Sequence, residues 1–403
     1  MGYLGVRGER SVGQRDARRA RWVEHAAHGS DPDLASIGRR FELPGAYVAG
    51  TRHGSGHIHE TFVASYADAG RRARFVHQRL NTHVFADLAA LMRNLERVTG
   101  HLRAGLEREG VRDLERRCLT LVPTPDERSF CTDDEGGVWR TFRFIEGART
   151  HDPPAGPTVA FEAARACAGF VARLADLDPH ELAVTIPRFH DLASRFADLQ
   201  TARRADVAGR AADVGREIDA ASLWFERLAR ELEREGAAGV PRRSVHNDCK
   251  LNNVMIDEAT GEGVCVIDLD TVMEGSVLFD FGALVRTAAC PSPEDEVDLA
   301  SMRFDLGLFE ALARGYLLGG ESFLTEPEIR ALPSAGSLLA LQHVIRFLTD
   351  HLSGDVYFRI HREGHNLDRA RAQLRLVELM DEASDATRRI VTRAAREARR
   401  AAR

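Results

Sequence analysis

The sequence predicts an α+β protein of two lobes, in which a small antiparallel sheet precedes a larger, mainly helical region. Short β-branched and apolar runs, separated by turn residues, recur in the first third of the chain. From Pro157 onward, apolar residues recur instead at helical spacing. A strand-turn-strand pattern interrupts the helical part at residues 253–268. The 403 residues are long for one domain and short for three, which fits two lobes.

Composition narrows the class of protein. Hydrophobic residues make up 44% of the chain and charged residues 29%, as in ordinary soluble globular proteins. The net charge of −6 and the dispersed basic residues argue against a general nucleic-acid binder. No run of about 18 apolar residues predicts a membrane-spanning helix. We therefore expect a cytoplasmic protein without a nucleic-acid or membrane partner, and no pattern indicates a protein partner.

The N-terminal segment and the cysteines support this expectation. Residues 1–30 read as a disordered or loosely helical extension. No hydrophobic segment follows the basic run at 18–21, which argues against a secretory signal. The cysteines show no metal-ligand spacing and no Cys-x-x-Cys pair, so we expect reduced, partly buried thiols. The six are Cys118, Cys131, Cys167, Cys249, Cys265 and Cys290.

The first lobe contains a glycine turn beside two predicted strands. Gly54, Ser55 and Gly56 lead into an apolar strand, a polar tip follows at 68–74, and a second strand covers 75–80. Backbone N–H groups of such a turn can cover phosphates. A plain hairpin turn is the alternative, since a lone Gly-x-Gly is a weak signal.

A helix and two further strands complete this lobe. Residues 87–103 have the apolar spacing of an amphipathic helix, and the runs 119–122 and 138–145 read as strands. Glu146-Gly147 ends the last run, which places the boundary near residue 148. We thus predict a nucleotide-binding lobe over 31–148 and a catalytic and substrate-binding lobe over 149–403. Helices are predicted in the second lobe at 161–177, 220–235, 299–318 and 338–352, with one long helix at 368–403.

The most informative segment spans residues 246–282. It contains His246, Asp248, Asn253, Asp268 and Asp280 in the order His-x-Asp-x4-Asn, Asp, Asp. Phosphoryl transfer depends on positioning and charge neutralisation, and so needs a carboxylate to orient the acceptor and oxygen ligands for magnesium. Asp248 can accept a proton from a hydroxyl, while Asn253 and Asp268 offer the hard oxygens that Mg²⁺ prefers.

The spacing places the two predicted metal ligands together. The apolar runs 253–257 and 264–268 flank a turn-rich connection around Gly261. If the chain folds back there, Asn253 and Asp268 become neighbours. Each residue alone would more often be part of a polar loop or an Asx cap. The complete ordered set on a hairpin favours a metal site.

These residues resemble the catalytic core of the aminoglycoside phosphotransferase and choline kinase superfamily. The resemblance implies a protein-kinase-like bilobal fold, with ATP as phosphoryl donor and Mg²⁺ as cofactor. It implies that Asp248 is the catalytic base and that Asn253 and Asp268 are the magnesium ligands. His246 and Asp280 would support the catalytic loop.

One feature of composition bears on nucleotide binding. Protein-kinase-like folds place a strand lysine on the phosphates, yet the only lysine of this chain, Lys250, lies in the catalytic loop. Backbone amides or an arginine must then serve. Arg79 or Gln78, at the end of the second strand, would then take the place of that lysine. Phe144, just before the break between the lobes, is a further predicted nucleotide contact.

A closer resemblance, over residues 45 to about 380, is to the N-acetylhexosamine 1-kinases. These enzymes transfer the γ-phosphate of ATP to the anomeric hydroxyl of GlcNAc or GalNAc. The resemblance implies a sugar substrate, with Arg346 and Tyr357 as sugar contacts and His57 as a further candidate for the sugar site. Asp270 is also predicted to bind the substrate. It is carried by residues 54–58, 78–85, 139–147, 247–282, 346–358 and 365–371.

The residues themselves leave alternatives open. Arg346 could form an ion pair with Asp350 at i+4, Tyr357 could simply pack, and His57 could cap the glycine turn. The chain also departs from the family at Glu274-Gly275 and at residues 283–286, which bears on the identity of the sugar.

Three competing functions share parts of this pattern. An aminoglycoside- or choline-type kinase would share the core, and an acidic acceptor pocket would indicate such a cationic acceptor. A non-catalytic kinase-like ATP-binding module would fit the missing strand lysine. A magnesium-dependent hydrolase would use the same carboxylates without needing the glycine turn.

Overall fold

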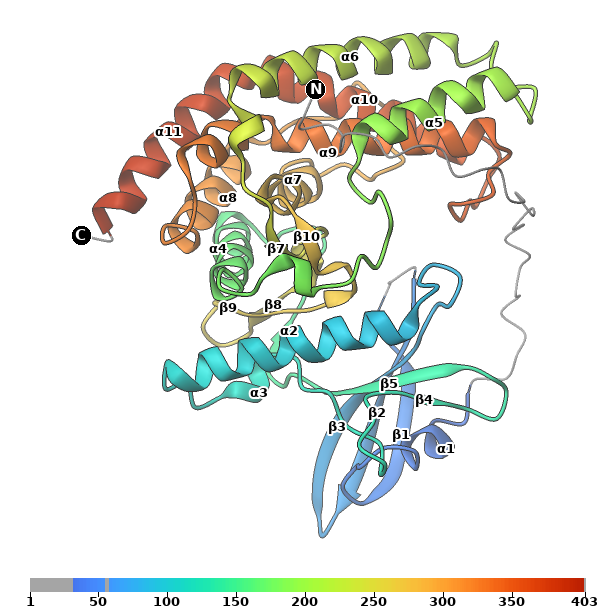
Figure 1. Cartoon of the computed structure of the whole chain (residues 1–403), viewed down its shortest axis with the longest axis vertical. Helices are drawn as coiled ribbons and strands as arrows, with labels where there is room; N and C mark the ends of the chain where they lie inside the picture. The colour runs from blue at the N-terminus through green and yellow to red at the C-terminus, as the bar shows by residue number, and fades with distance from the viewer. Residues whose placement is uncertain (1–31, 55–57, 402–403) are drawn as a thin grey trace.

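The computed structural model describes residues 32–54 and 58–401 (Figure 1). The predicted disordered extension at 1–30 lies outside the described residues, as do Ser55, Gly56 and His57. Within the described ranges, no helix has the length and apolar character needed to cross a bilayer.

An antiparallel sheet of five strands forms the N-terminal lobe, in the order β1-β2-β3-β5-β4 (Figure 1). Phe62, Phe75 and Trp139 bury one of its faces in a small core together with the short helix α1 (Leu34–Gly38). The strands are β1 (Ala46–Arg52), β2 (Glu60–Asp68), β3 (Arg71–Arg79), β4 (Cys131–Thr132) and β5 (Val138–Arg143).

The polar tip predicted at residues 68–74 is wrong, because most of it belongs to the strands. Asp68 pairs with Arg71, so the turn consists only of Ala69 and Gly70, both at positive φ. A two-residue turn of this kind suits the twist of a hairpin. The end of the hairpin is exposed to solvent. Polar residues can therefore occur within its strands, and here they do not indicate a loop.

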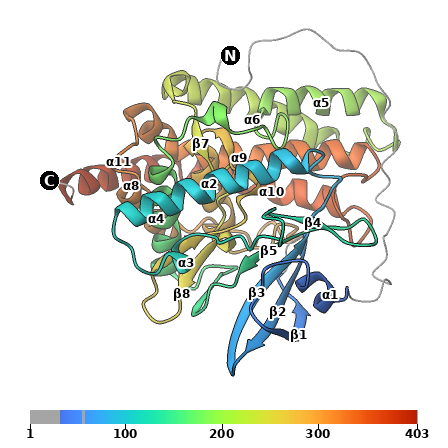
Figure 2. The ribbon, with the colours of Figure 1, turned by 60° about the horizontal axis from the view of Figure 1, so that its bottom comes forward.

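The predicted amphipathic helix is confirmed as α2 (Leu88–Arg108), which runs five residues further than expected. Asp87 caps it by accepting a hydrogen bond from the amide of Ala90 at 2.8 Å. Leu95, Val98 and other apolar residues of α2 join the main core of the protein. The helix lies between the five-stranded sheet and the helical lobe (Figures 1 and 2), followed by the short α3 (Leu114–Arg117).

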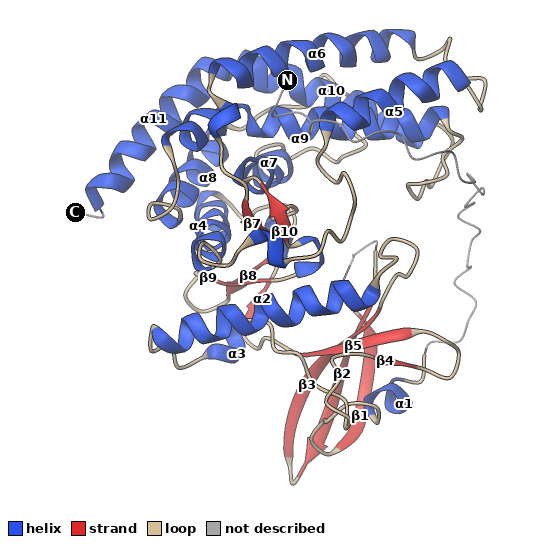
Figure 3. Ribbon diagram, viewed as in Figure 1, coloured by secondary structure: helices blue, strands red, loops and turns tan. Residues whose placement is uncertain are grey.

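Two small sheets lie within the second lobe (Figure 3). β6 (Ala148–Arg149), β8 (Val254–Asp257) and β9 (Gly263–Val266) form one sheet, and β7 (Arg243–Val245) with β10 (Met273–Gly275) forms the other. The chain therefore leaves the first sheet after Arg143 and enters the second at Ala148. The predicted lobe boundary falls at this crossing.

Helices build the rest of the second lobe (Figure 3). The α-helices are α4 (Pro157–Arg173), α5 (Leu192–Ala205), α6 (Gly215–Arg234), α7 (Val277–Ala288), α8 (Leu306–Gly319), α9 (Glu326–Leu352), α10 (His365–Glu382) and α11 (Ser384–Ala401). The 3-10 turns are η1 (Pro179–Glu181), η2 (Ala237–Gly239), η3 (Leu251–Asn253) and η4 (Leu269–Thr271).

The single C-terminal helix predicted from 368 onward is wrong, because the segment forms α10 and α11 with a break at Ala383. α10 packs mainly on α9, whereas α11 packs on α8 as well as on α9. Alanine and arginine favour helix throughout this segment, so no glycine or proline marks the break. Tertiary packing decides where the helix ends.

The expectation that all six cysteines are free thiols is also wrong. Cys167 on α4 and Cys249 form a disulfide across 82 residues of sequence. Cys249 directly follows Asp248, so the bond ties the predicted catalytic loop to α4. The other four cysteines are free and buried.

Candidate active site

The hairpin predicted to join the two metal ligands is confirmed. Val254 pairs with Val266 and Met255 with Cys265 in the antiparallel β8-β9 pair. Beyond the strands, the amide of Ile267 donates to the carbonyl of Asn253 at 2.9 Å. Asn253 and the residue after Ile267, Asp268, therefore lie at the same end of the hairpin.

The predicted catalytic loop, residues 246–253, orients the side chain of Asn253. Its Nδ2 donates to the backbone oxygen of Asp248 at 2.9 Å. Because the nitrogen is used in this bond, the side-chain oxygen is the atom that Asn253 can offer to a cation.

Asp268, the second predicted metal ligand, lies in a strongly desolvated position. It adopts a left-handed backbone conformation (φ 62°), which Asp accepts more readily than most residues. Desolvation raises the pKa of its carboxyl, and the nearby charge of Asp270 raises it further, against the lowering effect of Lys250. A carboxyl that resists ionisation in this way is stabilised by an added cation.

These two oxygen donors fit Mg²⁺. No cluster of three or more His, Cys, Asp or Glu side chains suited to a metal occurs in the part of the chain that the structure describes. Mg²⁺ is commonly held by one or two protein oxygens together with substrate phosphates and water. A shared site of this kind needs no third carboxylate.

His246 and Asp280 hold the catalytic loop from behind. The Nδ1 atom of His246 accepts from the amide of Asp248 at 3.2 Å, so its Nε2–H donates to the carbonyl of Ile267 at 2.9 Å. Oδ2 of Asp280, on α7, accepts from the amide of His246 at 3.0 Å. Burial raises the pKa of Asp280 to about 6. The roles of His246 and Asp280 as supports of the catalytic loop stay predictions.

Asn247 is a supporting residue that the sequence analysis did not single out. It has a positive φ of 65°, and its Nδ2 donates to the carbonyls of Thr271 and Met273 at 3.0 and 3.3 Å. A side chain at Gly275 would lie 2.1 Å from the Asn247 oxygen, so this glycine is required. The bonds join the catalytic loop to the segment after Asp268. The only sign of this role in the sequence was that an asparagine stands between His246 and Asp248 in the motif.

The single lysine lies beside the predicted base. Lys250 Nζ is 3.3 Å from Asp248 Oδ2, and the charge of Asp248, opposed by desolvation, raises the pKa of the lysine. Asp248 is partly exposed, with 32% of its side chain accessible. The site therefore contains a cation although the N-terminal sheet supplies no lysine.

Of the predicted nucleotide contacts, Gly54, Arg79 and Phe144 lie within the described residues. Gly54 has a φ of 79°, which favours glycine. Arg79 is partly exposed, with Nη1 3.6 Å from a carboxylate oxygen of Glu60. Phe144 lies under the guanidinium of Arg74 and 6.4 Å from the ring of His53, beside the glycine turn. These positions leave the nucleotide roles as predictions.

The substrate contact predicted for Asp270 does not match the structure. Its side chain is 3% exposed, and both of its oxygens accept hydrogen bonds from Arg140, at 2.5 and 2.7 Å. His59 adds a third contact at 2.6 Å. The Asp270 carboxylate is thus buried and held by three donors from the first lobe, and it is not exposed to a sugar. Arg140 lies 130 residues upstream, so the local motif contains no sign of this pairing.

Arg346 and Tyr357, in contrast, lie together. Nη2 of Arg346 donates to the Tyr357 hydroxyl at 3.3 Å, and 51% of Tyr357 is exposed. The alternative ion pair between Arg346 and Asp350 is absent from the described contacts. Asp350 instead accepts from the backbone amides of residues 356–358 and from Asn366, and so shapes the loop that carries Tyr357.

The surroundings of Arg346 are positively charged. His190 connects them to the catalytic loop, because its Nε2 lies 2.7 Å from the carbonyl of Asn247. Burial lowers the pKa of His190 to about 4, with Arg346 adding to the shift. Burial and then the charge of Arg346 also lower the pKa of Arg195 on α5. Neither Arg195 nor Arg346 has an acidic partner among the described ion pairs.

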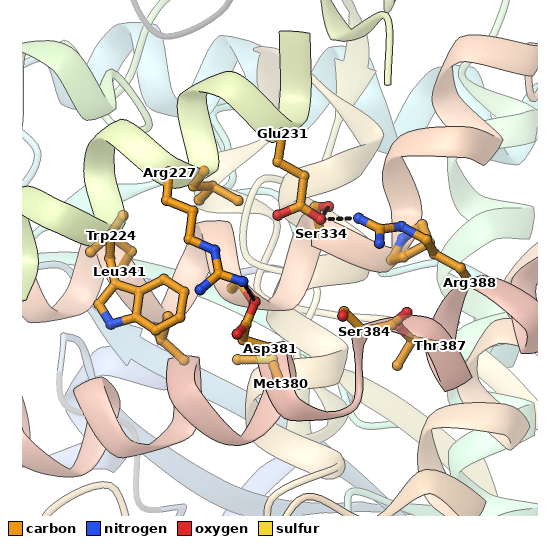
Figure 4. Close-up of a pocket in the computed structure, with 14 residues that line it drawn as sticks. Trp224, Arg227, Glu231, Ser334, Leu341, Met380, Asp381, Ser384, Thr387 and Arg388 are labelled. Atoms are coloured by element: carbon orange, nitrogen blue, oxygen red, sulfur yellow. Dashed lines mark hydrogen bonds and ion pairs between the residues drawn. The ribbon is translucent and has the colours of Figure 1, made fainter. Parts of the chain in front are cut away.

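A small cavity of about 20 Å³ elsewhere in the helical lobe contains none of the predicted site residues (Figure 4). It lies between α6, α9, α10 and α11, with Trp224 in its wall. Its charged groups pair with one another, Arg227 with Asp381 and Arg388 with Glu231. The cavity therefore offers no unsatisfied charge to a substrate.

Comparison with known proteins agrees with this geometry. The phosphotransferase enzyme family matches residues 106–321, more than half of the chain. An aminoglycoside phosphotransferase from Alicyclobacillus acidocaldarius is similar in structure, with a TM-score of 0.55 at 14% identity, covering 93% of this chain and 100% of that one. A choline kinase from Cryptosporidium parvum has a TM-score of 0.50 at 16% identity, covering 87% and 96%.

A third similar structure is the GDP complex of aminoglycoside 2'-phosphotransferase-IIIa, with a TM-score of 0.50 at 10% identity, covering 85% of this chain and 94% of that one. At these identities the structures establish the fold, and they confirm the predicted α+β, kinase-like arrangement of a sheet lobe and a helical lobe. The family match covers more than half of the chain, and it therefore establishes the family as well as the fold. This chain belongs to the phosphotransferase enzyme family.

Proposed function

We propose that this phosphotransferase uses ATP and Mg²⁺ to phosphorylate the anomeric hydroxyl of an N-acetylhexosamine, GlcNAc or GalNAc. The observation that carries the proposal is the pair of Arg346 and Tyr357, which has no acidic partner among the described ion pairs. The charge of Arg346 acts on His190, which contacts the backbone of Asn247 next to Asp248. The pair presents a guanidinium, a hydroxyl and an aromatic face, the groups that bind the oxygens and the apolar face of a sugar.

The donor nucleotide would bind under the first sheet. The glycine turn, with Gly54, Ser55 and Gly56, would cover the phosphates, while Arg79 and Phe144 contact the nucleotide. A similar structure was determined with GDP bound, which supports a nucleotide donor for this fold. Asn253 and Asp268 would hold Mg²⁺, which when bound supplies neutralisation of phosphate charge.

Residues of the catalytic loop would carry out the transfer. Asp248 would orient the sugar hydroxyl toward the γ-phosphorus and accept its proton as the new O–P bond forms, while the bond from the γ-phosphorus to the bridging oxygen breaks and ADP leaves. Lys250, 3.3 Å from Asp248, supplies positive charge where the transferred phosphoryl group passes. His246, Asn247 and Asp280 keep the loop in place through the hydrogen bonds described above.

Charge at the acceptor side favours a neutral sugar over a cationic acceptor. Arg346 and Arg195 have no acidic partners among the described ion pairs, and an aminoglycoside or choline would meet their repulsion there. His57 stays a predicted sugar contact. The intact set of Asp248, Asn253 and Asp268 favours an active kinase over a non-catalytic ATP-binding module.

A coupled ADP-release assay tests the proposal. Purified protein with ATP and Mg²⁺ is offered GlcNAc, GalNAc, glucosamine, glucose, choline and an aminoglycoside, and the product is tested for loss of reducing-end reactivity. Turnover on an acetylated hexosamine with a blocked reducing end supports it. Turnover only on a cationic acceptor discards the sugar assignment and keeps the kinase. ATP binding without turnover on any acceptor supports the non-catalytic module.

A further inference from the structure

A buried ion pair joins the N-terminal sheet to the turn that carries Asp268. Arg140 on β5 and Asp270 in η4 are only 2% and 3% exposed. Nη1 and Nη2 of Arg140 donate to the two oxygens of Asp270 at 2.5 and 2.7 Å. A two-point contact between a planar guanidinium and a planar carboxylate fixes their separation and also their relative orientation.

His59 strengthens the same connection from just before β2. Its Nδ1 accepts from the amide of Asn81 at 3.0 Å, so the ring proton lies on Nε2, which donates to Asp270 at 2.6 Å. The ring also stacks on Phe85, with centroids 5.5 Å apart. Two side chains of the first lobe thus hold one carboxylate of the second.

The remaining polar atoms of this group are also used. Nε of Arg140 donates to Gln78 Oε1 at 2.9 Å, and Thr185 Oγ1 donates to the backbone oxygen of Asp270 at 2.9 Å. Each side-chain nitrogen of Arg140 and each carboxylate oxygen of Asp270 therefore has a partner within the chain, and both side chains are buried, so the group acts on the reaction through what it holds in place.

Stability alone does not account for this arrangement. Burial of two charges costs desolvation, and well-packed apolar side chains are often equally stabilising. The pair supplies a fixed geometry between lobes. Asp268 lies two residues before Asp270 on the same turn, so a displacement of η4 would move the predicted metal ligand as well.

We propose that Arg140, together with His59, is a positioning residue for Asp268 and couples the placement of the N-terminal sheet over the nucleotide to the formation of the metal site. The N-terminal sheet contains no lysine, but its Arg140 places one buried cation at the contact between the two lobes. The inference rests on the proposed binding of nucleotide and Mg²⁺, and is independent of which acceptor is used.

Metal affinity tests the proposal without relying on turnover. Mn²⁺ is titrated into the ADP-bound protein and followed by electron paramagnetic resonance, and ADP affinity is measured separately in EDTA. Groups that orient metal ligands typically contribute about 10- to 100-fold to metal affinity. We expect a loss of this size in Arg140→Met and a smaller one in Arg140→Lys, while metal-free ADP affinity stays the same.

Two further variants separate positioning from stability. Arg140→Met leaves a buried unpaired carboxylate, which lowers stability. Arg140→Met/Asp270→Leu removes both charges, so stability recovers while the Mn²⁺ affinity stays low. The control is Arg243→Met/Glu328→Leu, which removes a two-point pair (2.8 and 3.2 Å) contained within the helical lobe. We expect the control to lower stability without weakening Mn²⁺ binding.

The outcomes are distinct. Wild-type Mn²⁺ affinity in the folded double variant at Arg140 and Asp270 would overturn the positioning role. An equal loss in the control pair would also overturn it, because the effect would then follow stability. If the wild-type protein binds neither ADP nor Mn²⁺, the proposed function fails and this inference fails with it.

Discussion

Two regions of the helical lobe collect acidic side chains that burial makes harder to ionise. In the catalytic segment, burial raises the pKa of Asp268 and Asp280. Between α6, α9 and α11, burial raises the pKa of Glu235 to about 7, and the charge of Glu231 adds to this rise. Glu231 lines the cavity shown in Figure 4. The cavity described above adjoins the second region. Raised pKa values would therefore point to both regions as candidate active sites, and the cavity would point to the second.

The partners of the carboxylates distinguish the two regions. Ser334 donates to both glutamates, at 3.2 Å to Glu231 and 2.9 Å to Glu235, and Arg388 contacts both. The glutamate pair is satisfied within the chain. Asp268, at the mouth of a hairpin beside Asn253, has no arginine partner among the described ion pairs. A candidate active site is therefore better recognised by charge left for an external partner than by a shifted pKa.

The largest expected effect of a substitution lies at the predicted base. Asp248→Ala removes the group that orients the acceptor and takes its proton, and kcat should fall about 100- to 10 000-fold with the fold retained. Steady-state ADP release and circular dichroism check this. The control is the Glu235→Gln variant, which changes an acid of the other region and should keep nearly the wild-type turnover rate. Near-normal turnover in Asp248→Ala would falsify the assignment.

The second-largest effect on activity is expected from loss of a predicted metal ligand. Asp268→Asn keeps the shape but removes the charge that holds Mg²⁺, so activity at low Mg²⁺ should fall roughly 100-fold, consistent with several kcal/mol from the metal. Titration of Mg²⁺ should show partial recovery at high concentration. An unchanged Mg²⁺ requirement would remove Asp268 from the metal site.

A smaller effect is expected at the acceptor side. Arg346→Ala should raise KM for the sugar about 10- to 100-fold, the size of a lost charged hydrogen bond, with a lesser change in KM for ATP. Arg227→Ala is the control, because that guanidinium also lies over an aromatic ring, Trp224, at 4.9 Å, but in the other region. Equal effects of the two substitutions on KM would show that Arg346 is structural.

The smallest effect concerns the pH dependence of stability. The folded-state pKa of Glu235, about 7, lies above its ordinary 4.5, so between these values the folded protein binds more protons than the unfolded one. Stability therefore falls as pH rises from about 4.5 to 7. Glu235→Gln removes this penalty and should be more stable than wild type by up to about 3 kcal/mol above pH 7.

Denaturant unfolding at pH 5 and pH 8 measures this difference. The stabilisation should be small at pH 5 and should grow toward pH 8, with turnover unaffected at both. A difference that does not change with pH would mean that Glu235 is ionised normally in the folded protein.

The catalytic hairpin could be predicted because its information is local. Asn253 and Asp268 are joined by two short strands and one turn, so residue spacing alone places them at the same end. The same holds for α2, where an Asp cap and helical spacing lie within one segment. Sequence reasoning works where the interacting groups belong to a single hairpin or helix.

Other features depend on contacts between distant segments. Asp270 reads as a member of the local motif, yet its partner Arg140 comes from another lobe. Cys167 and Cys249 have no recognisable spacing, and the break at Ala383 follows from what α10 and α11 pack against. None of these has a local signal, because each is decided by which surfaces meet after folding.

The sequence by itself determined the order of elements, the two-lobe division and the set of acidic and amide side chains at the hairpin mouth. Only the tertiary structure decided which of those side chains stay available: Asp268 is left without an arginine partner, whereas Asp270 is neutralised by Arg140. The physical reason is that hydrogen-bonding type is a property of each residue, but whether a charge is already paired depends on neighbours brought together by the whole fold.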